Sequence, residues 1–212
     1  MEKRCMIFSG GDFSGPAERE KGSFVIACDH GLAHALACGI TPDLLVGDFD
    51  SYTLPLPPGI PVLDLPVEKD DTDTMAAVRY AVKEKYLRIK ILNAFGGRLD
   101  HLLGNLQAAA FTAEHGAEAE LCGADEHVVF LASGERVFPP RPGWSLSVLA
   151  FSDRCEGVSI QGAKYELKDA RVSNTFPIGV SNEWNGPVTV RVKQGILMVI
   201  SSRMPEKELE EQ

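Results

Sequence analysis

The sequence lacks the loop motifs by which many nucleotide-binding proteins are recognised. It contains no G-x-x-x-x-G-K-[ST] phosphate loop and no G-x-G-x-x-G dinucleotide fingerprint. It also lacks an excess of positive charge, because 21 Lys and Arg stand against 30 Asp and Glu, for a formal net charge of −9. Such a chain is repelled by nucleic acid and by anionic membranes, which argues against general binding to either. An acidic enzyme with a phosphorylated substrate would need metal ions or a local basic pocket.

Cysteine and long apolar runs are also scarce. The five cysteines are odd in number and show no C-x-x-C spacing, which argues against a disulfide framework or a zinc site. We therefore expect buried free thiols in a reducing compartment. No apolar run approaches the length of a membrane span, and the run after Met1–Arg4 is too short for a signal peptide. We expect a cytoplasmic protein with no membrane partner.

What remains is an ordinary globular composition, 44% hydrophobic and 24% charged, whose first part alternates strands with helices. Apolar runs end in polar, glycine-containing turns, and helical segments follow them. This alternation predicts an α/β domain over residues 1–132, with a mainly parallel sheet flanked by helices. The predicted strands are Cys5–Phe8, Phe24–Cys28, Leu44–Val46, Ile60–Leu65 and Ile89–Phe95, and the predicted helices are Leu32–Cys38, 72–86 and 100–114.

After Gly123 the helical periodicity disappears, and short β-rich runs separated by Gly, Pro and Asp take over. They predict a compact all-β domain, a sandwich or barrel, over residues 133–205. The stretch Pro139–Pro142 reads as a stiff connector near the boundary, and residues 206–212 as a frayed, charged tail. The predicted strands are His127–Leu131, Ser145–Phe151, Val158–Gln161, Val188–Val192 and Ile196–Ile200.

The stretch Gly47-Asp48-Phe49-Asp50-Ser51 follows an apolar run and reads as the exit of a buried strand, where open α/β sheets place ligands. In an extended segment Asp48 and Asp50 would share one face and repel each other unless a cation lay between them. The pattern predicts a magnesium-nucleotide site at this sheet edge, with Phe49 anchored in the core. The alternative is an acidic loop of turn-forming aspartates.

Further acids follow the later strands. Asp70 and Asp73 are one helical turn apart at the start of the helix that Thr72 opens, and Asp100 stands where the cap of the next helix belongs. Carboxylates here suit Mg²⁺ bound to nucleotide phosphates. They would equally cap free N–H groups and complement the helix dipole, so for these residues alone both interpretations stay open.

The turn Gly96-Gly97-Arg98 precedes Asp100 and favours the functional interpretation. Two glycines let the backbone approach a phosphate, the following helix offers free N–H groups, and Arg98 can bind phosphate oxygens with both arms of its guanidinium. A glycine pair alone is weak evidence. Histidines are further candidates for phosphate or substrate contact, although each could be a polar cap of a turn: His30, His34 and His101.

In the second domain, Tyr165 and the stretch Ser181–Trp184 combine aromatic, amide and hydroxyl groups on a β-rich background. Such a set suits a flat heteroaromatic ligand, through stacking and edge hydrogen bonds. The alternative is a core tyrosine and a hairpin turn at Asn185-Gly186, and the residues alone slightly favour it.

Together these motifs resemble the thiamine pyrophosphokinase family, with similar order and spacing from about Ile7 to Ile200. The combination is more specific than any one motif. Two positions depart from the family pattern: His30 stands where the family commonly has glycine, and Tyr165 stands where some relatives have tryptophan. The motifs are Asp29-His30-Gly31, Pro42-Asp43, Gly47–Ser51, Asp70–Asp73, Gly96–His101 and Gly179–Glu183.

The resemblance implies an α/β domain that binds Mg-ATP, a C-terminal β-sandwich, and a homodimer in which thiamine lies between the α/β domain of one subunit and the β domain of the other. It implies transfer of the diphosphoryl group of ATP to the thiamine hydroxyl, giving thiamine diphosphate and AMP. Two rival hypotheses are a diphosphokinase for another hydroxymethyl heterocycle, such as a pterin, and a sensor without catalytic activity that binds thiamine or nucleotide.

The resemblance also assigns roles to residues. The implied Mg²⁺ ligands are Asp48, Asp50, Asp70 and Asp73. The implied catalytic residues are Asp50, Asp73, Arg98 and Asp100. The implied ATP contacts are Asp29, Gly31, Asp48, Gly96, Gly97, Arg98 and His101. The implied thiamine contacts are Tyr165, Ser181 and Asn182.

Overall fold

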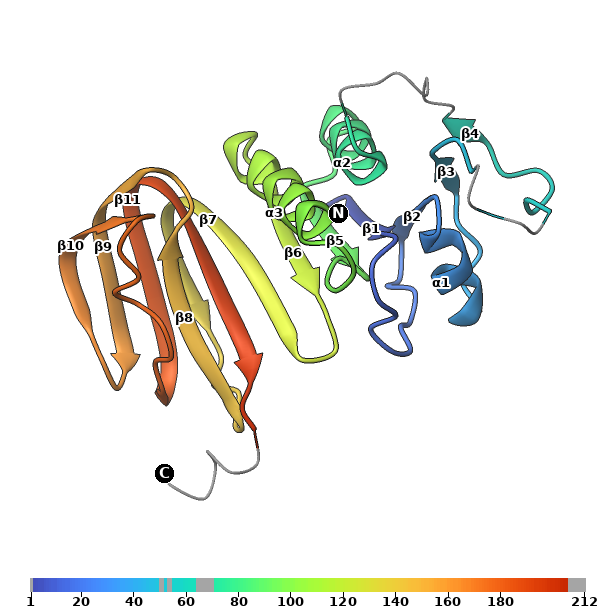
Figure 1. Ribbon diagram of the computed structural model, residues 1–212. Helices are drawn as coiled ribbons and strands as arrows, with labels where there is room; N and C mark the ends of the chain where they lie inside the picture. Colours follow the sequence, from blue (N-terminus) through green and yellow to red (C-terminus); the bar gives the residue numbers. More distant parts are fainter. Residues whose placement is uncertain (1, 50–51, 53–54, 64–70, 206–212) are drawn as a thin grey trace. The chain divides into compact units, whose positions relative to one another are not determined.

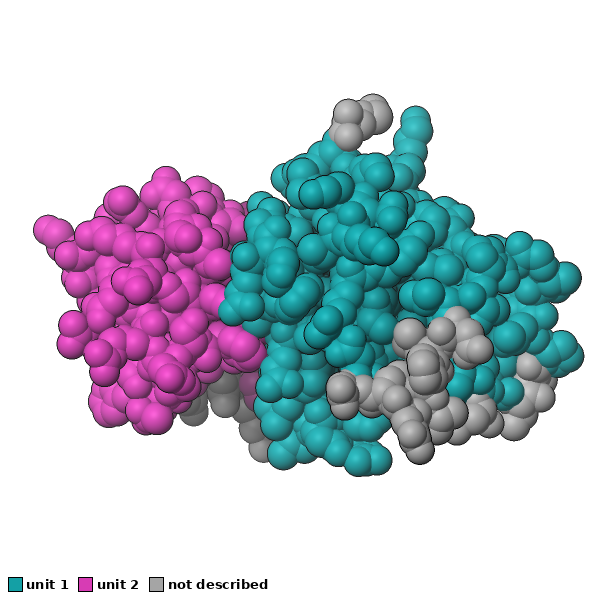
Figure 2. Space-filling view, turned by 90° about the horizontal axis from the view of Figure 1, so that it is seen from above, with its two compact units in different colours: residues 1–124 teal, residues 125–212 magenta. Residues whose placement is uncertain are grey.

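The computed structural model describes residues 2–49, 52, 55–63 and 71–205 (Figure 1). The chain forms two compact units, residues 1–124 and residues 125–212 (Figure 2). Each has its own cluster of buried apolar side chains. The predicted boundary between residues 132 and 133 falls inside the long strand β7 (Glu126–Phe138), which pairs along its length with β11 (Trp184–Arg203) of the second unit.

The first unit contains an open sheet with strand order β6-β5-β1-β2-β3-β4. All five neighbouring pairs are parallel, so the predicted parallel sheet is confirmed for the described residues. One strand, β6, was not predicted; in it Glu118 and Glu120 alternate with buried Ala119 and Leu121. The strands are β1 (Arg4–Phe8), β2 (Ser23–Cys28), β3 (Leu44–Val46), β4 (Val62–Leu63), β5 (Arg88–Leu92) and β6 (Glu118–Cys122).

Helices flank this sheet on both faces (Figure 1). Alternate residues of a strand face opposite sides, so Met6 and Phe8 of β1 pack with Leu32 of α1, while Cys5 and Ile7 are buried on the other side. Thr72 caps α2 as predicted, because its hydroxyl accepts a hydrogen bond from the Met75 N–H at 3.2 Å. The helices are α1 (Gly31–Ala37), α2 (Asp73–Lys83) and α3 (Leu99–Glu114). In the described part of the chain no helix is long and apolar enough to cross a membrane.

The second unit is built only of antiparallel strands, as predicted. Its central strand, β11, pairs with β7 on one side; on the other, residues 189–194 pair with β9 and residues 197–203 with β8. Because β11 changes partners along its length, the strands form one branched sheet around a single core, which refines the predicted sandwich. The other strands are β8 (Trp144–Ala150), β9 (Arg154–Ala163) and β10 (Leu167–Ser173).

Two predictions for this unit were wrong. The runs 188–192 and 196–200 are one strand, interrupted only by a register shift between Val192 and Ile196. Asn185-Gly186 makes no hairpin turn but lies within β11, where the pairing with β9 is irregular.

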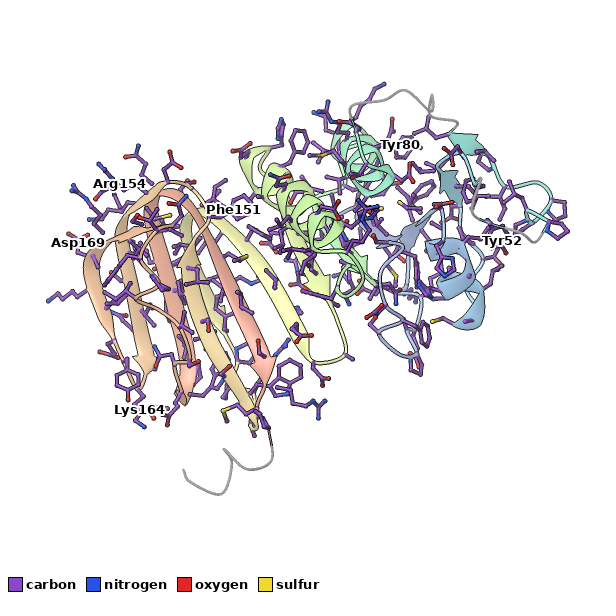
Figure 3. The ribbon with its side chains drawn as sticks, in the orientation of Figure 1. Tyr52, Tyr80, Phe151, Arg154, Lys164 and Asp169 are labelled. Atoms are coloured by element: carbon purple, nitrogen blue, oxygen red, sulfur yellow. The ribbon has the colours of Figure 1, made fainter. Side chains whose placement is uncertain are left out.

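At the edge of the unit, Asp169 of β10 (Figure 3) accepts a hydrogen bond from Lys193 at 2.6 Å, and charged side chains of this kind protect an edge strand from further pairing.

Candidate active site

The first unit contains a cavity of about 410 Å³ where the carboxyl ends of its strands meet the beginnings of α2 and α3. This is the edge at which open α/β sheets bind ligands. The cavity brings together side chains from five separate stretches of the chain. It is lined by Ser9, Gly10, Gly11, Cys28, Asp29, His30, Thr72, Asp73, Thr74, Gly96, Gly97, Arg98, His101 and Asn105.

Two of the predicted acids meet around a glycine. Gly47 follows β3, and a Cβ atom at this position would lie 3.4 Å from the Asp29 Cβ and 3.4 Å from the Asp73 carboxylate. The Asp29 N–H also donates to the carbonyl of Val46 at 3.1 Å, which ties the ends of β2 and β3 together. Asp29 and Asp73, 44 positions apart in sequence, are therefore neighbours at one sheet edge.

The stretch after Gly47 differs from its predicted geometry. The prediction assumed an extended segment, but Phe49 has a φ of 55°, in the left-handed region, so the backbone is not extended at Phe49. Phe49 is buried at 8% exposure, as predicted, and its ring meets that of Tyr52 (Figure 3) edge-on at 6.4 Å. Asp48 is exposed and is not among the residues that line the cavity. Asp50 and Asp70 lie outside the described residues.

Arg98 and Asp100 form a bidentate ion pair at the rim. Arg98 Nε donates to Asp100 Oδ1 at 3.1 Å and Nη2 to Oδ2 at 2.5 Å. This hydrogen bond raises the pKa of Arg98 and lowers the pKa of Asp100. The predicted cap position of Asp100 was wrong: Arg98 occupies the cap, and Asp100 lies in the first turn of α3, where it accepts from the His101 N–H at 3.0 Å.

Buried polar residues of the cavity wall were missed by the sequence analysis. The hydroxyls of Ser9 and Thr74, 3% and 5% exposed, lie 2.8 Å apart and connect the end of β1 to α2. Asn105, also buried, donates from Nδ2 to the carbonyl of Ala94 at 2.9 Å, which fixes the chain just before Gly96. The available signal was an amide inside the apolar stretch of α3, since a buried polar group needs a partner.

Gly31, a predicted ATP contact, is the first residue of α1. A Cβ atom on Gly31 would lie 2.1 Å from the carbonyl oxygen of Phe8, so this glycine allows helix and strand to pack closely and does not line the cavity. His30 does line it, and its ring meets that of His34 edge-on at 5.2 Å. His34 Nε2 lies 2.9 Å from the carbonyl oxygen of Gly11.

The predicted thiamine contacts lie in the second unit. Tyr165 is 62% exposed, and with buried Asn182 it borders a small cavity of about 70 Å³. The Asn182 side chain accepts from the Tyr165 N–H at 2.9 Å and donates to the Tyr165 carbonyl at 2.7 Å, so it shapes the backbone beneath the ring. Ser181 is exposed, with a φ of 57°, and is not among the residues that line this cavity.

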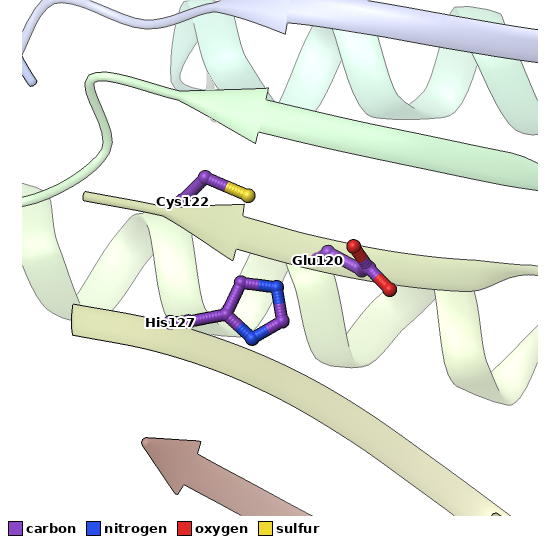
Figure 4. Close-up of side chains that lie close together, drawn as sticks. All are labelled: Glu120, Cys122 and His127. Carbon is purple, nitrogen blue, oxygen red and sulfur yellow. The ribbon is translucent and has the colours of Figure 1, made fainter. Parts of the chain in front are cut away.

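The cysteines are free thiols, as predicted. Cys5, Cys28 and Cys155 are buried, whereas Cys38 and Cys122 are half-buried. Cys122 projects from β6 on the same face as Glu120, two residues away (Figure 4). Burial raises the pKa of the Cys155 thiol, which keeps it protonated and unreactive at neutral pH.

An open parallel sheet with a glycine-lined, acidic cavity at its carboxyl edge is the arrangement in which many α/β proteins bind nucleotides or phosphates, and here it is joined to an all-β unit. Comparison with known families is more specific. Residues 17–121 match the thiamin pyrophosphokinase catalytic domain, and residues 137–197 match the thiamin pyrophosphokinase vitamin B1 binding domain. The chain belongs to the thiamin pyrophosphokinase family.

Similar proteins agree with this assignment. The chain is 29% identical over 184 residues to the thiamine pyrophosphokinase of Bacillus subtilis (strain 168), covering 84% of this chain and 86% of the relative. A crystal structure of thiamine pyrophosphokinase from Bacillus subtilis superposes with a TM-score of 0.87 at 27% identity, covering 95% of this chain and 99% of the other. The yeast thiamin pyrophosphokinase structure shares the fold, with a TM-score of 0.70 at 10% identity over 99% of this chain and 89% of the other.

Proposed function

We propose that the protein transfers the diphosphoryl group of ATP to the hydroxyl group of thiamine, giving thiamine diphosphate and AMP. The observation that carries this proposal is the cavity of the first unit, in which Asp29, Asp73 and Arg98 lie around two glycine pairs. Family membership supports thiamine as the acceptor. In the reaction a bond forms between the thiamine hydroxyl oxygen and the β-phosphorus, and the bond from that phosphorus to the oxygen bridging it to the α-phosphorus breaks.

The acidic side of the cavity fits a magnesium ion. Mg²⁺ prefers oxygen ligands and binds through one or two carboxylates together with water and substrate phosphates. Asp73 and Asp29 meet around Gly47, a position without a side chain, which leaves room beside both acids. Asp48, with Asp50 and Asp70 outside the described residues, completes the proposed acidic set. When bound, the ion would neutralise charge on the phosphate oxygens.

The protein's own residues would position the phosphates and handle the proton. The backbone at Gly10-Gly11 and Gly96-Gly97 comes close to the cavity without side chains in the way, and the beginning of α3 adds the positive end of a helix dipole. The Arg98 guanidinium binds phosphate oxygens when it exchanges its Asp100 partner for them. Asp100, released from Arg98, is then the carboxylate that takes the hydroxyl proton from thiamine.

The second unit would bind the acceptor. The exposed ring of Tyr165 offers a face for stacking on a heteroaromatic ring. Asn182 is hydrogen-bonded to the Tyr165 backbone, and Ser181 precedes Asn182 in the chain. A cavity of about 70 Å³ is far smaller than the roughly 300–1,000 Å³ of typical ligand pockets, so Tyr165 needs a further surface to enclose thiamine. We propose that a second copy of the chain provides it in a homodimer.

The test is the product of the purified protein incubated with ATP, Mg²⁺ and thiamine, resolved by mass, beside a reaction with the metal chelated. We expect AMP and thiamine diphosphate in equal amounts, and neither without metal. ADP with thiamine monophosphate would overturn the diphosphoryl transfer, and absence of any product would overturn the proposed function. A parallel reaction with a hydroxymethyl pterin identifies the acceptor, and product there but not with thiamine would refute the thiamine assignment.

A further inference from the structure

Asn93 has an unusual backbone conformation directly after β5. Its φ is 56°, in the left-handed region that non-glycine residues seldom occupy, and its side chain is only 2% exposed. Asparagine tolerates this conformation better than most residues. A buried amide must nevertheless be hydrogen-bonded, and the partners of Asn93 identify what it holds.

The backbone around Asn93 runs beside the loop that follows β1. Three backbone N–H groups of this loop donate to carbonyl oxygens at the end of β5 and just beyond it. The bonds are Ser9 to Leu92 at 2.9 Å, Gly11 to Asn93 at 2.8 Å and Asp12 to Phe95 at 2.8 Å. The pairing of β1 with β5 therefore continues beyond both strands, into the two loops that carry the glycine pairs of the cavity.

These loops touch closely at two glycines, where an added Cβ atom would collide with the opposite loop. A Cβ atom on Gly11 would lie 2.5 Å from the carbonyl oxygen of Asn93, and one on Gly96 would lie 2.0 Å from an Asp12 carboxylate oxygen. At Gly11 the opposing atoms belong to the backbone and at Gly96 to the Asp12 side chain, so a small displacement of one loop shifts the other.

The Asn93 side chain adds two hydrogen bonds across the same contact. Its Nδ2 atom donates to the carbonyl oxygen of Asp12 at 3.2 Å and to the hydroxyl of Ser14 at 3.2 Å. An amide nitrogen has two protons, so both are used. Glycine at this position would keep the backbone conformation but lose both bonds.

We propose that Asn93 is a positioning residue for the ATP triphosphate: its amide clamps the loop after β1 to the loop after β5, so that Gly10-Gly11 and Gly96-Gly97 meet the phosphates at a fixed separation. The inference rests on the proposed function, because it assigns Asn93 to the same nucleotide site. It predicts a defect in the use of ATP and not in the use of thiamine.

The main variant is Asn93→Gly, which removes the two side-chain bonds while allowing the left-handed backbone. Because both side-chain hydrogen bonds across the loop contact are lost, we expect the KM for ATP to rise about tenfold. The KM for thiamine should change less than twofold. Ser14→Ala removes one of the two bonds and should raise the KM for ATP about threefold. Lys85→Gly is the matched control, since Lys85 is exposed with a φ of 64° and does not line the cavity.

Binding of a non-hydrolysable Mg-ATP analogue, measured by calorimetry, should weaken in the same order and is independent of turnover. A purely structural role would lower the Tm of Asn93→Gly and leave the KM for ATP unchanged, which would overturn the proposal, as would an equal rise in both KM values. If the wild-type protein makes no product but binds the analogue more tightly than Asn93→Gly does, the proposed reaction is refuted and the positioning role of Asn93 is supported. Equal analogue binding by both proteins refutes the clamp.

Discussion

The two units present their candidate residues in different ways. In the first unit the candidate residues line a cavity of about 410 Å³ and are held by buried partners such as the Ser9–Thr74 hydroxyl pair. In the second, the cavity beside Tyr165 is about 70 Å³ and the tyrosine ring is 62% exposed. The first unit presents a formed pocket, and the second presents a surface.

The difference follows from the chemistry that each unit would perform. Stabilising phosphate charge requires groups held in place before the substrate arrives, because reorganising them would cost free energy during the reaction. Stacking on a flat ring tolerates small displacements. Substitutions in the first unit should therefore damage turnover more than substitutions in the second.

The largest effect is expected at Asp73. Asp73→Asn removes a carboxylate from the proposed magnesium site and should lower kcat about a thousandfold. The helix should persist, since losing a charge from the first turn of α2 costs only about 0.3–1 kcal/mol. Steady-state kinetics at saturating Mg²⁺, together with the Tm, check both statements. Asp71→Asn is the control: Asp71 pairs with Arg79 at 3.0 Å, does not line the cavity, and should leave kcat within twofold. Similar losses in both variants would contradict a specific role for Asp73.

A smaller effect is expected at Arg98. Arg98→Lys keeps the charge but loses the guanidinium group, which can donate two parallel hydrogen bonds. The kcat/KM for ATP should therefore fall about thirtyfold. Arg79→Lys, a second exposed arginine paired with an aspartate, serves as the control and should behave as wild type. Full activity in Arg98→Lys would show that only charge matters at this position.

Tyr165 tests the second unit. Tyr165→Ala should raise the KM for thiamine about fivefold, because aromatic pairing is worth about 0.5–1.5 kcal/mol, while the KM for ATP stays unchanged. Tyr165→Trp should restore thiamine affinity, since a larger ring keeps the stacking face. If both variants raise the KM for ATP as much as the KM for thiamine, the assignment of thiamine binding to the second unit is wrong.

The smallest effect concerns pH. Arg98 holds the pKa of Asp100 below its ordinary value near 3.9, so the pair stabilises the folded protein above that value and the contribution is lost as pH falls through the lowered pKa. Both side chains are exposed, so Asp100→Asn should change the Tm by about 2 °C or less at pH 7. Thermal unfolding of both proteins between pH 7 and pH 3 should give curves that converge at the acid end. A gap that widens there would reverse the assigned sign.

Local sequence was enough to predict the strand ends that make the site. Parallel strands leave their carboxyl ends at one edge, so Asp29 and the Gly96-Gly97-Arg98 turn could be expected to converge, and they line one cavity. The apolar runs and the Thr72 cap likewise gave most elements of the first unit. These signals come from residues that are close in sequence, so they can be read without a structure.

Features that depend on backbone angles or distant partners were not predictable. Nothing in the residue types shows that Phe49 is left-handed or that Asn93 clamps a loop 80 residues before it. The stretch before Ile196 resembles a turn because of Gly195, yet it is a bulge in a continuous strand, and a Cβ atom on Gly195 would lie 2.6 Å from the Arg154 carbonyl oxygen. β10 was missed because its apolar residues are few and its pairing with β9 is irregular.

The position of β11 in the chain has a consequence for biosynthesis. It follows the other strands of its unit, yet it pairs with three of them: β7, β8 and β9. A ribosome must therefore finish nearly all of this unit before its sheet can close, whereas the first unit has all its described strands much earlier. Until then β7 and β8 expose unpaired edges that can join other nascent chains, so translational pausing or truncation within β11 should favour aggregation and chaperone binding.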